Sequence, residues 1–424
     1  MTETSETPAP SPDSVYAEAL SWYREHWDPT MALGDWWNLL ADAGWSYPSW
    51  PIGLGGGGLS SPAAKAAERA RTEVGAYGPP AGIATFLAAP TILAYGTDEQ
   101  KQRFLPGIIR GRNMWCQLFS EPGSGSDLAG MSTRAVRDGD EWLVTGQKVW
   151  NSGAQFADYA ILMARTDPEQ PKHRGITYFL IDMSQPGVEV RGLREMTGDV
   201  AFNEVFLADA RVADSDRLGE VGEGWRVAMT TLAHERDPAN TGLGAGAGFA
   251  KPDLDVSVEA HARSATDKVD GFALALSGGV SRLLSQLLDE FRVSDDPLVR
   301  QKQMKIFEMR RTSRWSGQRA VAAVKAGAEP GPGVSTLKLL GSEIGRQTRD
   351  LGLEAMGATG MLWGEDTPEK GSFHAYAMFT PAMSIAGGSD QIQRNIIGER
   401  VLGLPREPGE AEQRQQPWSE LPRN

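Results

Sequence analysis

Glu235 is a carboxylate whose position in the sequence is suited to proton transfer. The segment that ends at this residue has the spacing of an amphipathic helix, with Trp225, Ala228 and Leu232 recurring on one face. Glu235 continues that apolar face. Burial raises the pKa of a carboxyl, and a raised pKa suits a base that works near neutral pH. The alternative interpretation is a structural ion pair with Arg236 or another arginine of the helical region.

Two Gly- and Ser-rich segments can bring backbone N–H groups close to a ligand. The first, residues 118–130, has the sequence L-F-S-E-P-G-S-G-S-D-L-A-G and can surround an anion or the edge of a heteroaromatic ring. In the second, residues 385–400, Gly387 and Gly388 permit close approach and Ser389 is the predicted N-cap of a helix. Taken alone, each segment also fits an ordinary loop or helix start.

A third segment, residues 146–154, places a large aromatic side chain two residues before a hydroxyl. Its sequence is G-Q-K-V-W-N-S-G-A. On a β-strand, Trp150 and Ser152 would face the same side, where the indole can pack on a flat ring while the hydroxyl bonds its edge. The competing interpretation places Trp150 in the hydrophobic core.

The rest of the sequence argues against several other kinds of chemistry. Its five histidines lie far apart, none with a second ligand at metal-site spacing, so we predict no metal site. The G-x-G-x-x-G run at residues 53–58 does not follow a buried strand, which favours a loop over a dinucleotide site. Cys116 is the only cysteine and is predicted to be a small core residue in a reducing compartment.

Charge and hydropathy restrict the partners and the location. The net charge is −13 and no basic block is present, so neither nucleic acid nor an anionic membrane surface is an expected partner. No apolar run approaches the roughly 20 residues that span a bilayer. The first residues lack the basic and apolar regions of a signal peptide. We therefore expect a cytoplasmic protein.

Hydrophobic periodicity divides the 424 residues into helical, β-rich and again helical regions. Ser61 and Thr97 are predicted N-caps of two N-terminal helices. Short β-branched runs between turns predict an antiparallel barrel or sandwich in the middle. The predicted parts are a disordered tail at 1–14, an N-terminal helical domain at 15–113, a middle β-domain at 114–213, a C-terminal helical bundle at 214–405 and a polar tail at 406–424.

Taken together, these segments resemble the acyl-CoA dehydrogenase family in order, type and separation. The motifs F-S-E-P-G-x-G-S-D-L-A-G, G-Q-K-V-W-x-S-G-A and G-G-S-x-Q-I-Q-R-N-I-I-G-E-R-V-L-G-L-P are specific as a set. The stretch M-G-A-T-G, residues 356–360, resembles a further turn of the family, and the similarity spans residues 15–405. The resemblance implies an α+β, mostly α, fold: an N-terminal helical domain, a middle antiparallel β-barrel and a C-terminal four-helix bundle.

The resemblance also implies an FAD cofactor between the β-domain and the bundle, usually across a subunit boundary. Trp150 and Ser152 would pack against the flavin and bond its N5 region. The residues expected to line the isoalloxazine and the CoA entrance are Phe119, Ser120, Gly125 and Ser126. Those expected to touch the adenine and ribityl parts, some from a neighbouring subunit, are Glu354, Gly357, Ala358, Ser389 and Gln391. Arg300 is the candidate for a pyrophosphate-binding arginine.

The sequence departs from the family pattern in two places. Many members carry the catalytic base as the Glu of Y-E-G-T in the final loop, where this chain has A-G-G-S, residues 386–389. Members resembling isovaleryl-CoA dehydrogenase carry the base at the position matching Glu235, which is therefore the predicted base. The N–H of Gly387 would still polarise the thioester carbonyl. Residues 240–292 are longer than the family pattern, which leaves the acyl-chain specificity open.

The predicted activity is α,β-dehydrogenation of an acyl-CoA thioester, with proton abstraction by a Glu, hydride transfer to flavin N5 and electrons passed to an electron-transfer flavoprotein. Because the loop Glu is missing, a non-catalytic or half-site subunit of a hetero-oligomeric dehydrogenase stays an alternative. A flavin oxidase acting on a non-CoA or carrier-bound substrate is the third hypothesis. The expected assembly is a homodimer, a homotetramer or a heteromer with a homologous subunit.

Overall fold

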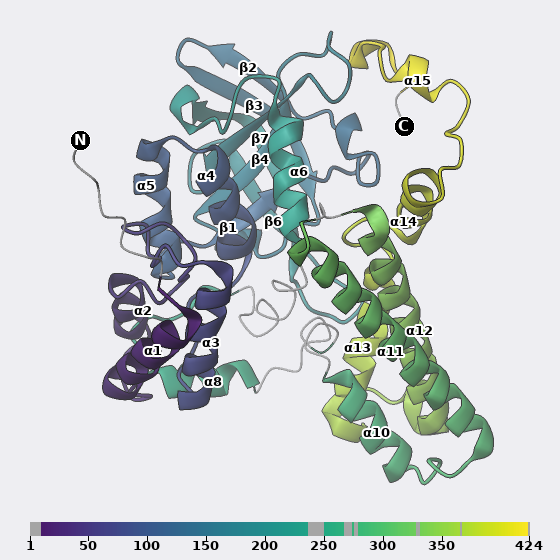
Figure 1. Cartoon of the computed structure of the whole chain (residues 1–424). Coiled ribbons are helices and arrows are strands. Elements are labelled where there is room, and N and C mark those ends of the chain that lie inside the picture. The colour runs from purple at the N-terminus through teal and green to yellow at the C-terminus, as the bar shows by residue number, and fades with distance from the viewer. Residues whose placement is uncertain are drawn as a thin grey trace.

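The computed structural model describes residues 10–235, 250–266, 274, 279–327, 331–364 and 367–422. Figure 1 shows the order of the chain: N-terminal helices in purple and blue, then a sheet, then helices in green and yellow. The predicted fold class, mostly helical with a sheet in the middle, is confirmed. Most of the predicted N-terminal tail, residues 1–9, lies outside the described residues, as do residues 240–249, 267–273 and 275–278 of the long 240–292 segment.

Two of the N-terminal helices begin at side chains that cap them, Ser11 before Pro12 and Thr97 before Asp98. Thr97 and Gln100 form the reciprocal side-chain and backbone bonds of a capping box, as the sequence predicts. The predicted cap at Ser61 is one residue late, because Ser60 is the extended N-cap residue and Ser61 is already helical. The elements are α1 (Pro12–His26), α2 (Leu33–Asp42), α3 (Ser61–Val74), the π-helix η1 (Ala84–Ala88), α4 (Ala89–Tyr95) and α5 (Asp98–Ile109).

The middle domain is a curled seven-stranded sheet within the described residues, in the order β1-β4-β2-β3-β7-β6, with β5 paired to β4. Its longest ladder joins β3 and β7 in antiparallel register, with an irregularity between Val144 and Gly146. The strands are β1 (Trp115–Leu118), β2 (Arg134–Asp138), β3 (Glu141–Val149), β4 (Tyr159–Arg165), β5 (Ile176–Asp182), β6 (Val188–Leu193) and β7 (Phe202–Ala213).

The sheet is not antiparallel throughout, which corrects one feature of the predicted β-domain. Strand β1 pairs with β4 in parallel, from Trp115 opposite Tyr159 to Leu118 opposite Leu162. Alternation of side chains looks the same in parallel and antiparallel strands, so the sequence pattern does not distinguish the two. Because β1 leads directly into residues 119–130, this pairing fixes where that segment leaves the sheet.

Helix α6 (Gly224–Glu235) packs between the N-terminal helices and the sheet. It packs against α4, η1 and β5, and Figure 1 shows it beside α4 over the strands. Thr231 is buried at this junction, where its hydroxyl lies 2.9 Å from that of Thr91 and 3.0 Å from that of Tyr178. Hydroxyls bonded to one another satisfy polar groups that would otherwise be costly inside the core. The helix is therefore held against both neighbours.

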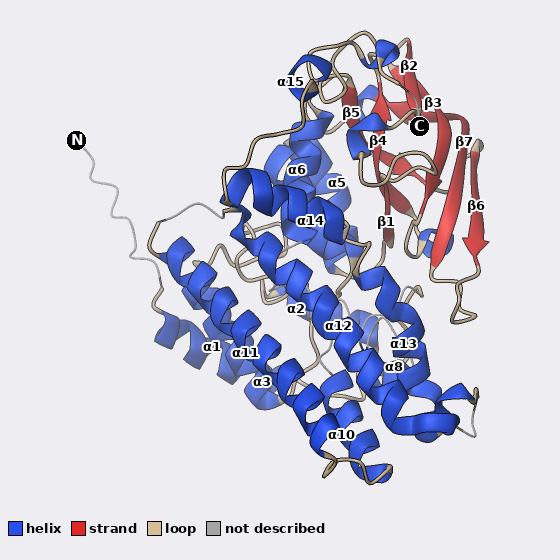
Figure 2. Cartoon of the chain, turned by 90° about the vertical axis from the view of Figure 1, so that its right-hand side faces the viewer, coloured by secondary structure: helices blue, strands red, loops and turns tan. Residues whose placement is uncertain are grey.

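The C-terminal helices form a bundle with its own hydrophobic core. Leu284, Leu287 and Leu288 of α10 pack there with residues such as Ile306 and Phe373 from later helices. Figure 2 shows these helices side by side, away from the sheet. The members of the bundle are α10 (Val280–Glu290), α11 (Pro297–Lys325), α12 (Ser335–Met356) and α13 (Ser372–Met383), followed by α14 (Asp390–Ile396). The short helix α8 (Val258–Thr266) instead packs against α2 of the N-terminal domain.

The end of the chain returns to the β-domain after the short helix α15 (Glu410–Gln413). The guanidinium of Arg165 lies 4.2 Å from the ring centre of Trp418, whose indole N–H donates to the carbonyl of Gly130 at 3.3 Å. This tail therefore contacts the segment that follows β1. Among the described residues, no helix is both long and apolar enough to cross a membrane.

Candidate functional site

The segment after β1 is anchored at one end and exposed at its tip. Phe119 is buried, and its ring centre lies 5.7 Å from that of Tyr178. Ser120 is partly exposed, and its carbonyl accepts from the N–H of Val149 at 2.9 Å, which ties the segment to the end of β3. Gly125 and Ser126, at the tip, are exposed. Their backbone N–H groups have no acceptor among the described residues and so are available to a ligand.

A buried ion pair that the sequence analysis missed provides the anchor. The ammonium of Lys148 lies 2.9 Å from the carboxylate of Glu121, and both side chains are buried. The backbone N–H groups of Ser132 and Thr133 also donate to that carboxylate, at 2.7 and 2.9 Å. Burial alone would raise the pKa of Glu121, but Lys148 and these donors lower it to about 2. The available signal was a lysine next to Val149 at the end of the strand, on the face that carries Trp142 and Val144.

Trp150 lies beside this segment and is turned out of the sheet. Strand β3 ends at Val149, so Trp150 and Ser152 are not alternate residues of a strand, and the predicted reason for their common orientation is wrong. Trp150 has a φ of 64° and its side chain is 63% exposed, which also excludes the core interpretation. The cause is the next residue, Asn151, whose buried side chain donates to the carbonyl of Gln117 at 2.7 Å and fixes the turn.

A positive φ is costly for a bulky residue and is found where surrounding structure enforces it, commonly at ligand sites. Among the rings of the described residues, the indole of Trp150 meets the edge of Phe202, with ring centres 6.0 Å apart. Ser152, two residues further on, is partly exposed. A strained, exposed aromatic ring beside a loop with available N–H groups is the arrangement that a flat heteroaromatic ligand requires.

Glu235 is the last described residue of α6 and is half-buried. The apolar face predicted for this helix is present, since Ala228 is buried in the core and Trp225 and Leu232 pack against it. Glu235 lies one turn beyond Thr231 on the same face of the helix. Thr231 bonds Tyr178, and the ring of Tyr178 contacts Phe119. Thr231, one turn before Glu235, is thus connected through Tyr178 to the segment at residues 119–130.

The final loop has the open backbone that the sequence predicts. Gly387 and Gly388 have φ values of 65° and 89°, and Ser389 caps α14 by accepting from the N–H of Ile392 at 3.3 Å. The N–H of Gly387 has no acceptor among the described residues. Gln391 is exposed on the first turn of α14. These groups can therefore donate to a ligand.

A second buried carboxylate, which the sequence analysis did not identify, holds this loop against the bundle. Asp390 lies 3.1 Å from the ammonium of Lys338 and 2.8 Å from the guanidinium of Arg346, both on α12. Burial would raise the pKa of Asp390, but these two cations and Ser342 lower it to about 2. An Asp directly after a helix cap resembles an ordinary first-turn acid, so no local sequence pattern predicts this role.

The remaining predicted residues lie elsewhere. Glu354, Gly357 and Ala358 are exposed at the carboxyl end of α12, whereas the Asp390 loop contacts the amino half of the same helix. At 1.5 Å per residue, Arg346 and Gly357 are about 16 Å apart along the axis. Glu354 pairs with Lys302, and Arg300 is exposed on α11. Within one chain these residues do not converge with the site built on residues 119–152.

A helical domain, a middle sheet with an exposed aromatic and open backbone, and a helical bundle together define a flavoprotein dehydrogenase fold. Models of the N-terminal, middle and C-terminal domains of acyl-CoA dehydrogenase match residues 13–112, 116–209 and 271–402. The chain is 38% identical to acyl-CoA dehydrogenase IpdE1 of Mycobacterium tuberculosis over 386 residues, which cover 88% of each protein. This protein belongs to the acyl-CoA dehydrogenase family.

Other relatives agree with this placement. Acyl-CoA dehydrogenase FadE34 of Mycobacterium tuberculosis is 37% identical over 367 residues; the match covers 87% of this chain and 46% of FadE34, so the chain spans about half of that relative. The solved structure of the Tcur3481-Tcur3483 steroid ACAD superposes with a TM-score of 0.69 at 26% identity, covering 93% of this chain and 98% of that chain. The ChsE4-ChsE5 complex from Mycobacterium tuberculosis gives a TM-score of 0.67 at 26% identity, covering 96% and 100%.

Members of this family are FAD-dependent flavoproteins, and the chain is accordingly an FAD-dependent oxidoreductase. The residues present fit such a cofactor. The exposed indole of Trp150 offers a flat surface, and the backbone N–H groups of Gly125 and Ser126, unpaired among the described residues, offer donors in the segment that Val149 ties to the end of β3. The metal-ligating residue types form no group of three or more that could hold an ion in the described part of the chain.

Proposed function

We propose that this protein catalyses the α,β-dehydrogenation of an acyl-CoA thioester, with Glu235 as the base. The observation that carries the proposal is the position of Glu235 one turn beyond Thr231. Thr231 is bonded to Tyr178, which in turn contacts Phe119 of the segment at residues 119–130, the segment that would face the flavin. A carboxylate at the end of an otherwise apolar helix face is suited to proton abstraction. The final loop carries no glutamate that could compete for the role, since its residues are A-G-G-S.

In this mechanism the carboxylate of Glu235 takes the proton from the carbon next to the thioester carbonyl. The N–H of Gly387 donates to the carbonyl oxygen and stabilises the negative charge that develops there. Bound FAD supplies the acceptor for the hydride that leaves the neighbouring carbon. Trp150 would hold the flavin ring by packing, and Ser152 would bond its edge. The electrons then pass to an electron-transfer flavoprotein, and the predicted location is the cytoplasm.

A second candidate function is that of one subunit in a hetero-oligomeric dehydrogenase. The observation that favours it is the separation of the predicted adenine-side residues Glu354, Gly357 and Ala358 from the rest of the site within one chain. A neighbouring subunit would bring such residues to the flavin. Two similar structures, the Tcur3481-Tcur3483 steroid ACAD and the ChsE4-ChsE5 complex, each name two different chains.

The test is an anaerobic titration of the purified protein with a panel of straight-chain, branched and ring-containing acyl-CoAs. The steroid ACAD among the similar structures is the reason for including ring-containing compounds. Bleaching of the bound flavin by one of these compounds supports the dehydrogenase. A protein that holds flavin or reacts only when mixed with a homologous subunit supports the second candidate. Bound flavin that no acyl-CoA reduces under either condition would contradict both.

A further inference from the structure

Three buried hydroxyls connect the sheet to helices α6 and α4. Tyr178 of β5, Thr231 of α6 and Thr91 of α4 each have a side chain that is fully buried. The hydroxyl of Thr231 lies 3.0 Å from that of Tyr178 and 2.9 Å from that of Thr91. These three side chains form a hydroxyl network. Thr231 lies one turn before Glu235, the last described residue of α6 and the proposed base.

The hydroxyl protons of the network have one arrangement. The hydroxyl of Thr91 lies 2.7 Å from the carbonyl oxygen of Leu87, which can only accept. Since the one proton of Thr91 is committed there, Thr231 donates to Thr91. The proton of Thr231 is then in use, and its 3.4 Å approach to the carbonyl of Val227 is the longer contact. Tyr178 therefore donates to Thr231, and burial, which raises the pKa of Tyr178, keeps that proton on the phenol.

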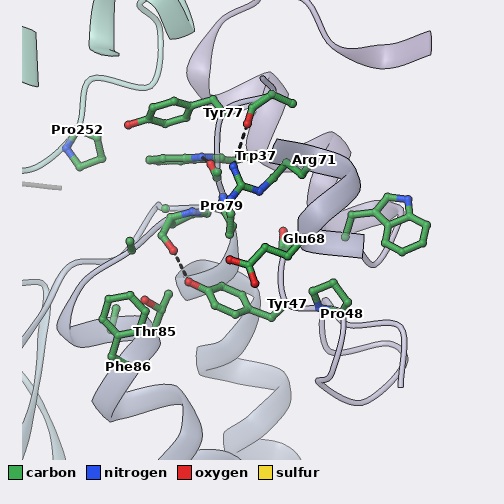
Figure 3. A pocket seen from close by; sticks show the side chains of 18 of the residues that line it. Trp37, Tyr47, Pro48, Glu68, Arg71, Tyr77, Pro79, Thr85, Phe86 and Pro252 are labelled. Carbon is green, nitrogen blue, oxygen red and sulfur yellow. Dashed lines mark hydrogen bonds between the residues drawn. The ribbon is translucent and has the colours of Figure 1, made fainter. Parts of the chain in front are cut away.

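The network ends at the π-helical turn η1. Leu87 belongs to this turn, and Pro90, three residues later, has no N–H to donate to the turn before it. Other residues of η1 line a cavity of about 800 Å³ in the N-terminal domain, where Figure 3 shows Thr85 and Phe86. None of the three network residues lines that cavity. The network therefore acts through the elements that it joins.

A second contact fixes the other end of α6 against the same strand. A Cβ atom at Gly224, the first residue of the helix, would lie 2.5 Å from the carbonyl carbon of Thr177 and 2.7 Å from the nitrogen of Tyr178, so only glycine fits. The helix is thus held at Gly224 by the backbone of β5 and at Thr231 by the side chain of Tyr178. These two points are about 10 Å apart along the axis, and together they determine how the helix is placed and turned.

The orientation of Glu235 depends on the second of these points. Glu235 follows Thr231 by four residues, about 6 Å along the axis and on the same face. Between them, Leu232 packs against the core. Tyr178 also contacts Phe119, with ring centres 5.7 Å apart. One tyrosine therefore touches both the helix of Glu235 and the segment at residues 119–130.

We propose that the hydroxyl network positions Glu235: Thr231 and Tyr178 hold the last turn of α6 at a fixed distance from the segment at residues 119–130. This role rests on the proposed dehydrogenase function, in which Glu235 is the base. The network residues are positioning residues, because none of them is accessible to a substrate. Proton abstraction requires the base to lie within hydrogen-bond distance of the proton, so a displacement of about 1 Å is sufficient to slow it.

The test uses one disruptive variant, one rescue and one matched control. Thr231→Val keeps the shape of the side chain but leaves the O–H of Tyr178 without its acceptor. Thr231→Ser restores the hydroxyl. In the control, Tyr95→Phe, another contact between α4 and α6 is removed, since the hydroxyl of Tyr95 lies 2.9 Å from that of Thr230. Melting temperature and flavin content establish that each variant is folded.

The first measurement does not depend on activity. Hydrogen exchange of the flavin-loaded protein is followed by mass spectrometry. In Thr231→Val we expect the amides of residues 232–235 to exchange roughly tenfold faster or more, because the last turn has lost its anchor. Exchange in Thr231→Ser and Tyr95→Phe should stay within about twofold of the native protein. Unchanged exchange in Thr231→Val, or an equal increase in Tyr95→Phe, would overturn the proposal.

A further variant keeps the test decisive if Thr231→Val does not fold. Tyr178→Phe removes the donor of the network and keeps the ring that contacts Phe119. The same increase in exchange at residues 232–235 is expected for this variant. Exchange that stays at the native rate in Tyr178→Phe would also overturn the proposal.

The second measurement is the rate of flavin reduction by the most reactive acyl-CoA. Thr231→Val should slow reduction roughly tenfold or more, with the half-saturating substrate concentration within about twofold, since the network does not touch the substrate. Deuterium on the carbon next to the thioester should slow the variant by a larger factor than the native protein, because proton abstraction has become the slower step. An unchanged isotope effect would mean that the variant only contains less active protein, and would overturn the proposal.

A double variant connects the network to Glu235. If Thr231 acts through Glu235, adding Thr231→Val to Glu235→Gln should change the reduction rate by no more than about twofold. A further tenfold loss in the double variant would mean that the network acts elsewhere, and would overturn the proposal. A native protein whose flavin no acyl-CoA reduces would contradict the dehydrogenase function, whereas the exchange measurement would still decide whether the network holds the last turn of α6.

Discussion

At the scale of single residues, Trp150 is held in a conformation that its own side chain disfavours. Its φ of 64° is imposed by the buried side chain of Asn151, and the exposed indole forms no core contact that would offset the cost. A strained, exposed aromatic residue that contributes little to folding is best explained by a ligand.

Trp150→Gly should therefore separate stability from cofactor binding. Glycine adopts a positive φ without strain, so the flavin-free variant should be as stable as the native protein or up to about 1 kcal/mol more stable. Its affinity for FAD should fall at least tenfold, because the packing surface is gone. Urea unfolding of the flavin-free proteins and a flavin titration measure the two effects. A variant that loses stability but keeps its FAD affinity would contradict the assignment.

The lowered pKa of Glu121 predicts that the stability of the fold depends on pH. Its pKa is about 2 in the folded protein against an ordinary value of 4.5, so it stabilises the fold above pH 4.5 and loses this contribution as the pH falls towards 2. Glu121→Gln leaves Lys148 buried without its counter-charge and should cost about 3–5 kcal/mol at pH 7. The difference from the native protein should shrink between pH 5 and about 3. Denaturant unfolding at pH 5 and at about pH 3 measures this difference in the free energy of unfolding, and Glu189→Gln, at an exposed residue, is the control. If the stability difference between the native protein and Glu121→Gln does not change with pH, the prediction is wrong.

At the scale of elements, the C-terminal tail packs against the segment at residues 119–130 and holds it in place. Trp418 stacks under Arg165 and donates to Gly130, the last residue of that segment. Trp418→Ala should lower the free energy of unfolding by about 1–3 kcal/mol, through the lost cation–π contact and hydrogen bond. Calorimetric melting measures the effect, and Gln415→Ala, on the exposed part of the tail, is the control. Equal melting temperatures for both variants would mean that the tail does not brace the segment.

The elements could be predicted from the sequence where periodicity and caps are local. The cap at Thr97, the apolar face of α6 and the interior position of Cys116 follow from residue type and spacing, and the structure confirms them. The glycine run at 53–58 is a loop, as its missing strand indicates. The Glu121–Lys148 pair and the parallel pairing of β1 depend on segments brought together only by folding, so no local pattern reveals them.

At the scale of the whole molecule, the bundle leaves apolar residues on its surface. Met304, Phe307 and Trp315 lie at helical spacing on one face of α11, and Trp315 is 61% exposed. Together with the distance between the carboxyl end of α12 and the loop at Gly387, this face fits contact with another subunit. The exposed apolar face of α11 and the distance between the end of α12 and the Gly387 loop therefore both predict a homomeric or heteromeric assembly.

Phe307→Glu should shift the assembly towards monomers, because a charge would be buried in the contact. Light scattering after size-exclusion chromatography measures the molar mass, and Lys305→Glu, on the same helix but off this face, is the matched control. We expect the flavin content to fall with the molar mass. A monomer would lack the residues predicted to bind adenine from the neighbouring subunit, Glu354, Gly357 and Ala358. An assembly unaffected by Phe307→Glu would place the contact elsewhere.

The central claim is that Glu235 takes the substrate proton, and the rate of flavin reduction tests it most directly. Stopped-flow absorbance would be recorded for the native protein, Glu235→Gln and Glu223→Gln, each loaded with FAD and mixed with the most reactive acyl-CoA. Glu223 precedes α6 and pairs with Arg226 at the surface, so it controls for loss of a nearby carboxylate. We predict that Glu235→Gln slows reduction at least 100-fold with FAD still bound, whereas Glu223→Gln stays within about twofold. Equal reduction rates in all three proteins would contradict the assignment of Glu235 as the base.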